Sequence, residues 1–233
     1  MSRPTTRRQG ARAARSGARP APAGARTPRG EATQATLVRA AKRIFERDGF
    51  LDARITDITA AAGTATGSFY KYFSSKEEIF LAVVEALADE GLHSMSLEIL
   101  SLEHDDLAGD ITKHLRRYLT VYQRNAKMMS VIEEVTNISD DFRRKRTARA
   151  QPYMNGNVAA IRALQEAGRA DPELDPLIAG RTLSIMVSRA AYVTFVLEEE
   201  GPGSIDGLAR TLTRLWINAL RIPVAETAGA TAL

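Results

Sequence analysis

The sequence has no cysteine and only three histidines in 233 residues. Disulfide bonds, thiolate zinc sites and cysteine nucleophiles are therefore excluded. The histidines show no paired spacing typical of metal ligands, and the chain has neither a glycine-rich phosphate loop nor a G-x-S-x-G elbow. With these signatures of catalysis missing, we expect a protein that is not an enzyme and that uses no cofactor.

Long apolar runs are also missing. No segment approaches the roughly 20 apolar residues that a membrane-spanning helix needs. The N-terminus lacks the apolar run of a signal peptide. We therefore expect no membrane partner and a cytoplasmic location.

Residues 1–30 contain no Leu, Ile, Val, Phe, Tyr or Trp, and they carry eight arginines with no acidic residue. Such a segment cannot bury enough apolar surface to offset its ordering entropy, so a disordered arginine-rich tail is expected. Residues 77–233 carry 23 acidic and 17 basic residues. Positive charge at one end favours a polyanionic partner. Whether the tail itself touches DNA or only reflects an arginine-rich composition is left open.

The remaining apolar residues recur at helical spacing, without the alternation typical of strands. This pattern predicts an all-α chain with a head at 31–78, a larger helical body at 79–223 and a flexible tail at 224–233. Helices are expected near residues 32–48, 106–123, 127–136, 140–167, 175–199 and 204–221. Pro152 should kink or split the helix in which it lies.

The segment Ile55–Glu78, ITDITAAAGTATGSFYKYFSSKEE, predicts a short helix, a glycine turn, a second short helix and the start of a long helix. This is the layout of a helix-turn-helix unit, whose second helix enters the DNA major groove. Phe69 and Phe73 should point inward, and Ser74 or Ser75 should cap the long helix. Small or hydrogen-bonding side chains make up the candidate DNA contacts: Thr64, Ala65, Thr66, Gly67, Ser68, Tyr70, Lys71, Tyr72 and Lys76. Tyr72 could instead be a packing residue.

The same string resembles the signature of the TetR family over roughly residues 32–80, through Ala61-Ala62-Gly63, Gly67-Ser68-Phe69-Tyr70, Tyr72-Phe73 and Ser75-Lys76-Glu77-Glu78. The resemblance implies that Thr66, Ser68, Tyr70 and Tyr72 contact DNA and that Lys76 binds a phosphate. It also implies an all-α C-terminal domain that dimerises and binds a small ligand, which releases the DNA. The chain departs from the family pattern at Arg54, Thr64 and Ala65, and Thr64 could supply the cap of the recognition helix.

Ligand sites in helical bundles are apolar cavities with a few polar groups. Large side chains on the expected helices give the candidate ligand contacts: Tyr118, Tyr122, Met128, Met129, Ile132, Phe142, Met154, Ile185, Met186, Tyr192 and Phe195. Any one of them could be an ordinary core residue. The effector itself is expected to be small and hydrophobic.

The last two expected helices, 175–199 and 204–221, are apolar over more than one face. Such breadth indicates burial against a second subunit as well as the chain's own core. A homodimer is therefore expected, and it would bind a double-stranded palindromic operator with half-sites about 34–36 Å apart. Bound effector should favour a conformation in which the heads no longer match the two half-sites.

Two other interpretations remain. His104, Asp105, Asp106, Asp110 and His114 could gather around a metal, although such a cluster is more often a solvated helix start. The chain could also be an architectural DNA-binding protein without sequence preference, driven by the arginine-rich tail. No metal site is expected, and a repressor is favoured over the architectural role.

Overall fold

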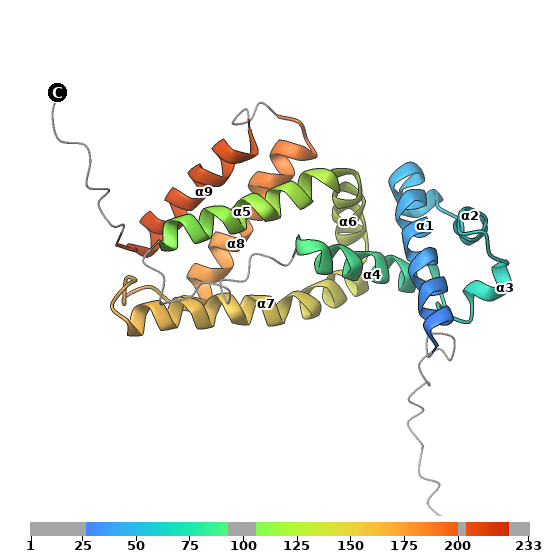
Figure 1. Ribbon diagram of the computed structural model, residues 1–233, viewed down its shortest axis with the longest axis horizontal. Coiled ribbons are helices and arrows are strands. Elements are labelled where there is room, and N and C mark those ends of the chain that lie inside the picture. Colours follow the sequence, from blue (N-terminus) through green and yellow to red (C-terminus); the bar gives the residue numbers. More distant parts are fainter. Residues whose placement is uncertain (1–26, 93–105, 200–203, 224–233) are drawn as a thin grey trace, which may run out of the picture.

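The computed structural model describes residues 27–92, 106–199 and 204–223, and every regular element in these ranges is a helix. The all-α prediction is confirmed, with a small head at one end and a larger helical body at the other (Figure 1). The elements are α1 (Pro28–Asp52), α2 (Ile55–Ala61), α3 (Thr66–Phe69), α4 (Lys76–Leu87), the π-helical turn η2 (Ala88–Leu92), α5 (Leu107–Arg124), α6 (Ala126–Ile138), α7 (Asp140–Glu166), α8 (Pro176–Phe195) and α9 (Ile205–Leu220).

The first helix begins earlier than expected. The Thr27 hydroxyl accepts a hydrogen bond of 3.1 Å from the Gly30 amide, and Pro28 occupies the first turn, where its missing N–H costs nothing. Residues 28–30 therefore belong to α1, with Thr27 as its cap, while residues 1–26 lie outside the described ranges. Near the other end of α1, Gly49 adopts a φ of +75°, which a side chain would disfavour.

Aromatic rings form the centre of the head. The Phe80 ring of α4 lies 5.0 Å from the Phe45 ring and 4.9 Å from the Phe50 ring, measured between centroids. On its other side, Phe80 lies 5.1 Å from Phe142 of α7. The core of the head therefore continues into α6 and α7, and α4 lies at the junction (Figure 1).

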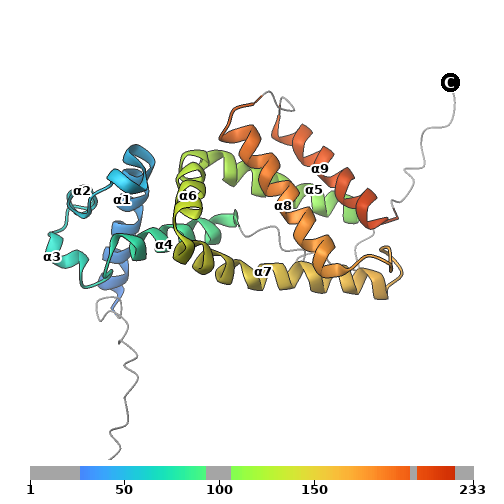
Figure 2. The same cartoon turned by 180° about the vertical axis from the view of Figure 1, so that it is seen from behind.

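The body is built around α5, which packs along α9 and α8, and its core contains the fully buried Trp216. Figure 2 shows α8 crossing between α7 and α9. α7 is one helix through Pro152, so the expected split is wrong. α7 packs against both α6 and α8. The boundaries of α5 to α9 otherwise lie within a few residues of the expected ones.

None of the helices in the described ranges combines the length and the apolar character that crossing a bilayer requires.

Candidate nucleic-acid interface and effector cavity

The head contains a helix-turn-helix made of α2, a glycine turn and α3. Ile58 of α2 is completely buried, and Gly63 forms the turn with a φ of +64°. The Thr64 amide donates to the Thr59 carbonyl at 3.0 Å and closes the turn. Arg54 occupies the capping position before α2, and its side chain makes no capping hydrogen bond.

α3 spans only Thr66–Phe69, and the chain continues in turns after it. Tyr72 and Phe73 each donate a backbone hydrogen bond to the Phe69 carbonyl, at 2.9 and 3.0 Å. Phe69 and Phe73 are buried, as predicted, and Tyr70 is 57% exposed. The segment therefore fixes Phe69 and Phe73 in the core and leaves Tyr70 and Lys71 facing solvent.

The candidate DNA contacts fall into three groups by exposure. Thr64, Ser68 and Lys76 are half-buried, and Tyr72 is buried at 9% exposure. The packing interpretation of Tyr72 is thus the one the structure supports. The fully exposed candidates lie together on α3 and the turn that follows it: Ala65, Thr66, Gly67, Tyr70 and Lys71.

Thr64 does not cap the recognition helix. The capping position is Ala65, which has no side-chain hydrogen bond, and the buried Thr64 hydroxyl has no partner among the described residues. Instead, the Thr66 hydroxyl lies 3.3 Å from the Thr59 hydroxyl, so the two helices of the unit are joined by a side-chain hydrogen bond.

Ser75 caps α4, since its hydroxyl accepts from the Glu78 amide at 3.2 Å, while the Glu78 carboxylate accepts from the Ser74 amide at 2.6 Å. Lys76, in the first turn, donates to the carbonyl oxygens of Phe50, Leu51 and Ala53 at 2.7, 2.9 and 3.0 Å. A lysine ammonium has three donors, and all three are occupied. The phosphate contact of Lys76 stays a prediction. The hydrogen bonds that Lys76 donates to the end of α1 were not predicted from the sequence.

The cation Arg54 was not among the candidate DNA contacts. It is exposed at the start of α2 and forms no ion pair with any described residue. An exposed arginine beside a recognition helix is suited to a phosphate contact. Its position next to the predicted helix start was a signal available in the sequence.

A cavity of about 670 Å³ lies in the body, walled by α4, η2, α5, α6, α7 and α8. Such a volume is typical of small-molecule sites. Five of the predicted ligand contacts line it: Tyr118, Met129, Ile132, Met154 and Ile185.

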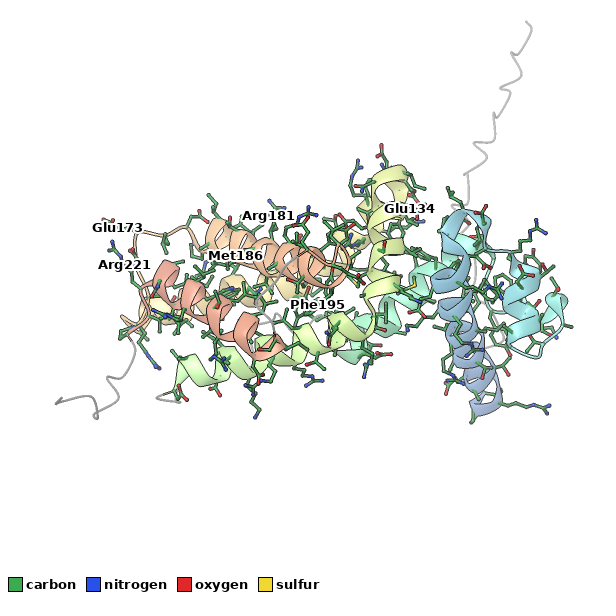
Figure 3. All side chains as sticks on the ribbon, turned by 90° about the horizontal axis from the view of Figure 1, so that it is seen from above. Glu134, Glu173, Arg181, Met186, Phe195 and Arg221 are labelled. Carbon is green, nitrogen blue, oxygen red and sulfur yellow. The ribbon has the colours of Figure 1, made fainter. Side chains whose placement is uncertain are left out.

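The other predicted ligand contacts do not line this cavity. Met128 and Phe142 belong to the core shared with the head. Tyr122 packs against Phe195, with ring centroids 6.3 Å apart. Met186, labelled with Phe195 in Figure 3, lies beside α9, and Tyr192 packs against the body core. Helical spacing shows that such residues are buried but does not show which neighbour they face.

Charged and amide side chains also line the cavity, although the candidate ligand contacts predicted from the sequence were all apolar or aromatic. Arg149 of α7 lies 2.6 Å from the Glu85 carboxylate of α4 and donates to the Leu81 carbonyl at 3.4 Å. Asn157 is 2% exposed and donates to the Ser184 hydroxyl at 3.0 Å. The signal was the spacing of three or four residues along α7 of Arg146, Arg149, Tyr153 and Asn157.

Burial raises the pKa of the Tyr118 hydroxyl and of the Tyr122 hydroxyl, and the positive charge of Arg146 opposes the shift at both. Both phenols therefore stay neutral at physiological pH, when each can donate one hydrogen bond.

The faces of α8 and α9 that point away from the core carry exposed apolar side chains. Ile178 is 65% exposed and Leu215 is 46% exposed. Contiguous exposed apolar patches mark interaction surfaces, so these side chains make the outer faces of α8 and α9 the candidate interface with a second subunit. The residues concerned on or beside these helices are Leu177, Ile178, Leu197 and Leu215.

A metal site finds no support in the described residues, which contain no group of three or more potential ligands. Asp106 caps α5, accepting from the Gly109 amide at 2.8 Å. His104 and Asp105 lie outside the described residues.

Residues 37–83 match the family model described as bacterial regulatory proteins, tetR family. The chain is 24% identical over 194 residues to the transcriptional regulator EthR of Mycolicibacterium smegmatis, covering 83% of this chain and 88% of the relative. Among solved structures, the SmeT–triclosan complex superposes with a TM-score of 0.69 at 18% identity, over 86% of this chain and 96% of that one. FadR of Bacillus subtilis, in complex with stearoyl-CoA, gives 0.67 at 14% identity, over 80% and 98%.

Proposed function

This chain belongs to the TetR family of bacterial regulatory proteins, and on that premise we propose that it is a ligand-responsive repressor. In this proposal the protein binds a palindromic operator as a homodimer in the cytoplasm and is released when a small, largely apolar effector enters the cavity. The family consists of transcriptional regulators and not of enzymes.

One observation supports this proposal above the others: α4 belongs to the head and to the cavity at once. Ile79 and Phe80 of α4 pack in the core of the head, while Leu81, Val84 and Glu85 line the cavity. A ligand that displaces the cavity end of this short helix therefore acts directly on the packing of the head (Figure 1).

The DNA-facing part of the proposal rests on exposure. Thr66 and Tyr70 are positioned by buried neighbours and present their side chains to solvent, where they could meet base edges or phosphates. Lys71 and Arg54 add positive charge on either side of the unit. Two such heads would read half-sites about 34–36 Å apart.

The dimer would form through α8 and α9, whose exposed apolar side chains a second subunit would cover. In such a symmetric pair a two-fold axis relates the two heads. A palindromic operator is the DNA counterpart of that symmetry.

Release would be a shift of population between two conformations of the dimer, and it cannot exceed the difference in the ligand's affinity for them. The Glu85–Arg149 ion pair joins α4 to α7 at the cavity wall, so a ligand that disturbs it changes how α4 is held.

The experiment is selection of fragmented genomic DNA by the purified full-length protein at near-physiological salt, read by sequencing. Recovery of a few sites that share a palindrome would support the specific regulator. Uniform recovery without a motif would overturn it in favour of the architectural DNA-binding protein.

A further inference from the structure

The Tyr118 side chain is only 5% exposed. Tyr118 lies on the wall of the cavity, on α5. Ligand cavities use a few such polar groups on an otherwise apolar wall to orient the bound molecule. As a neutral phenol it can donate to an acceptor.

Arg146 of α7 supplies further donors on the same wall. Its Nη1 atom donates to the Thr136 hydroxyl at 2.8 Å and lies 3.3 Å from the Glu133 carboxylate. Its Nε and Nη2 atoms have no partner within the described part of the chain. The guanidinium also lies close enough to Tyr118 to oppose the burial-driven rise in its pKa.

The remaining wall is mostly apolar. Its other polar side chains are Glu85, Asp89, Arg149, Tyr153, Asn157, Ser184 and Ser188. The Glu85 carboxylate is paired with Arg149 at 2.6 Å, so neither offers a full charge to a ligand. Asp89 is exposed at the rim. The apolar side chains come from α4, η2, α6, α7 and α8: Leu81, Val84, Leu87, Leu92, Met129, Ile132, Met154 and Ile185.

We infer that the cavity takes an amphipathic monocarboxylate, whose carboxylate accepts hydrogen bonds from Tyr118 and Arg146 and whose apolar body lies against α4, α6 and α8. The free Arg146 donors and one phenol match the oxygens of a single carboxylate. Because Arg146 already shares its charge with Glu133, a dianion such as a phosphate monoester is less well compensated. This inference rests on the proposed function, because it names the effector class of the same cavity.

The test is isothermal titration calorimetry of the full-length protein with three probes of one chain length, decanoate, decan-1-ol and decylamine, each below its micelle concentration. We expect decanoate to bind about 10-fold more tightly than decan-1-ol, since charge-assisted hydrogen bonds are the stronger ones. Decylamine should bind no more tightly than decan-1-ol.

Two variants locate the carboxylate. Arg146→Gln and Tyr118→Phe should each weaken decanoate binding by about 10-fold and leave decan-1-ol binding unchanged. Arg146→Lys should restore part of the loss. The matched control is Arg144→Gln on the same helix, since Arg144 has a side chain that is 70% exposed and lies outside the cavity wall. Circular dichroism establishes that each variant is folded.

Equal affinity for decanoate and decan-1-ol, tighter binding of decylamine, or no binding of any probe would overturn the monocarboxylate assignment. The genomic selection is run on the same preparation. A palindrome recovered without decanoate binding leaves the regulator and removes the ligand class. Decanoate binding that depends on Arg146, without any selected motif, leaves the site and removes the proposed function.

Discussion

The Lys76 ammonium lies 2.7 Å from the carbonyl oxygen of Phe50 and 4.8 Å from the centre of the same residue's ring. Lys76 thereby joins the first turn of α4 to the end of α1. The contact places a cation at a helix N-terminus, which the helix dipole disfavours, and the carbonyl oxygens around it compensate. α4 is thus joined to α1 by the hydrogen bonds of the Lys76 ammonium as well as by the contacts of the Phe80 ring.

Lys76→Met should lower the free energy of unfolding by about 2 kcal/mol, because hydrogen bonds to a charged donor are lost and carbonyl oxygens are left without it. Urea denaturation followed by circular dichroism measures this. Lys71→Met is the matched control, since Lys71 is exposed and near the recognition helix. Lys71→Met should leave the free energy of unfolding unchanged. It should reduce the slope of log operator affinity against log salt concentration by about 1, as expected for the loss of one phosphate contact.

If Lys76 instead serves only as a phosphate contact, the two variants will behave alike. Both would then reduce the salt dependence, and neither would change the urea midpoint.

Tyr70→Ala and Tyr72→Ala should separate DNA contact from packing. Tyr70 is 57% exposed, so its loss should weaken operator binding by about 1–3 kcal/mol without changing the melting temperature. Tyr72 is 9% exposed, and its truncation should cost about 3 kcal/mol of stability through the space left in the core. Electrophoretic mobility shift on the selected operator, paired with thermal melts, checks both. A stable Tyr72→Ala protein with lost binding would assign Tyr72 to DNA.

Breaking the Glu85–Arg149 pair should loosen the cavity end of α4. Glu85→Gln and Arg149→Gln should each speed amide hydrogen exchange in residues 81–92, and the double variant should show little further change. The effect should stay below about 1 kcal/mol, because both side chains are more than a third exposed. Arg143→Gln, whose partner Asp140 lies on the same helix, is the control and should not alter exchange in α4.

Leu215→Glu should convert the protein to a monomer, because a charge on the apolar face of α9 cannot be buried against a second subunit. Sedimentation velocity measures the change, and operator binding should fall with it. Ile138→Glu on α6 is the control, being 57% exposed but away from α8 and α9. A Leu215→Glu protein that remains dimeric would place the interface elsewhere.

His114 should make the protein less stable in acid. Burial, with a smaller effect from the charge of Arg117, lowers its pKa in the folded state. The unfolded chain, with an ordinary pKa near 6.5, then binds the proton more readily, so stability falls as the pH drops below about 6.5. His114→Leu should remove this part of the pH dependence, as measured by urea denaturation between pH 7.5 and 5.5. A steeper loss in the variant would contradict it.

The helices of the body were predictable because their apolar residues recur every three or four positions between strong breaks such as Gly168 and Asp175-Pro176. The buried positions of Phe69 and Phe73 followed from the same reasoning. The start of α1 was not predicted, because the cap from Thr27 depends on one short hydrogen bond within an arginine-rich sequence. Pro152 does not divide α7 into two helices, and α7 packs against both α6 and α8.

By itself the sequence determined that the chain is helical, that Ile55–Glu78 forms a helix-turn-helix and that the body is a bundle, because these depend on local spacing and on residues close in the chain. Only the tertiary structure decided which side chains meet across the bundle. Tyr118, Arg146 and Ile185 come from three different helices, and sequence spacing fixes the face of a helix but not its neighbour. The same is true of Lys76 and Phe50, which are separated by 26 positions and joined only when α1 and α4 pack.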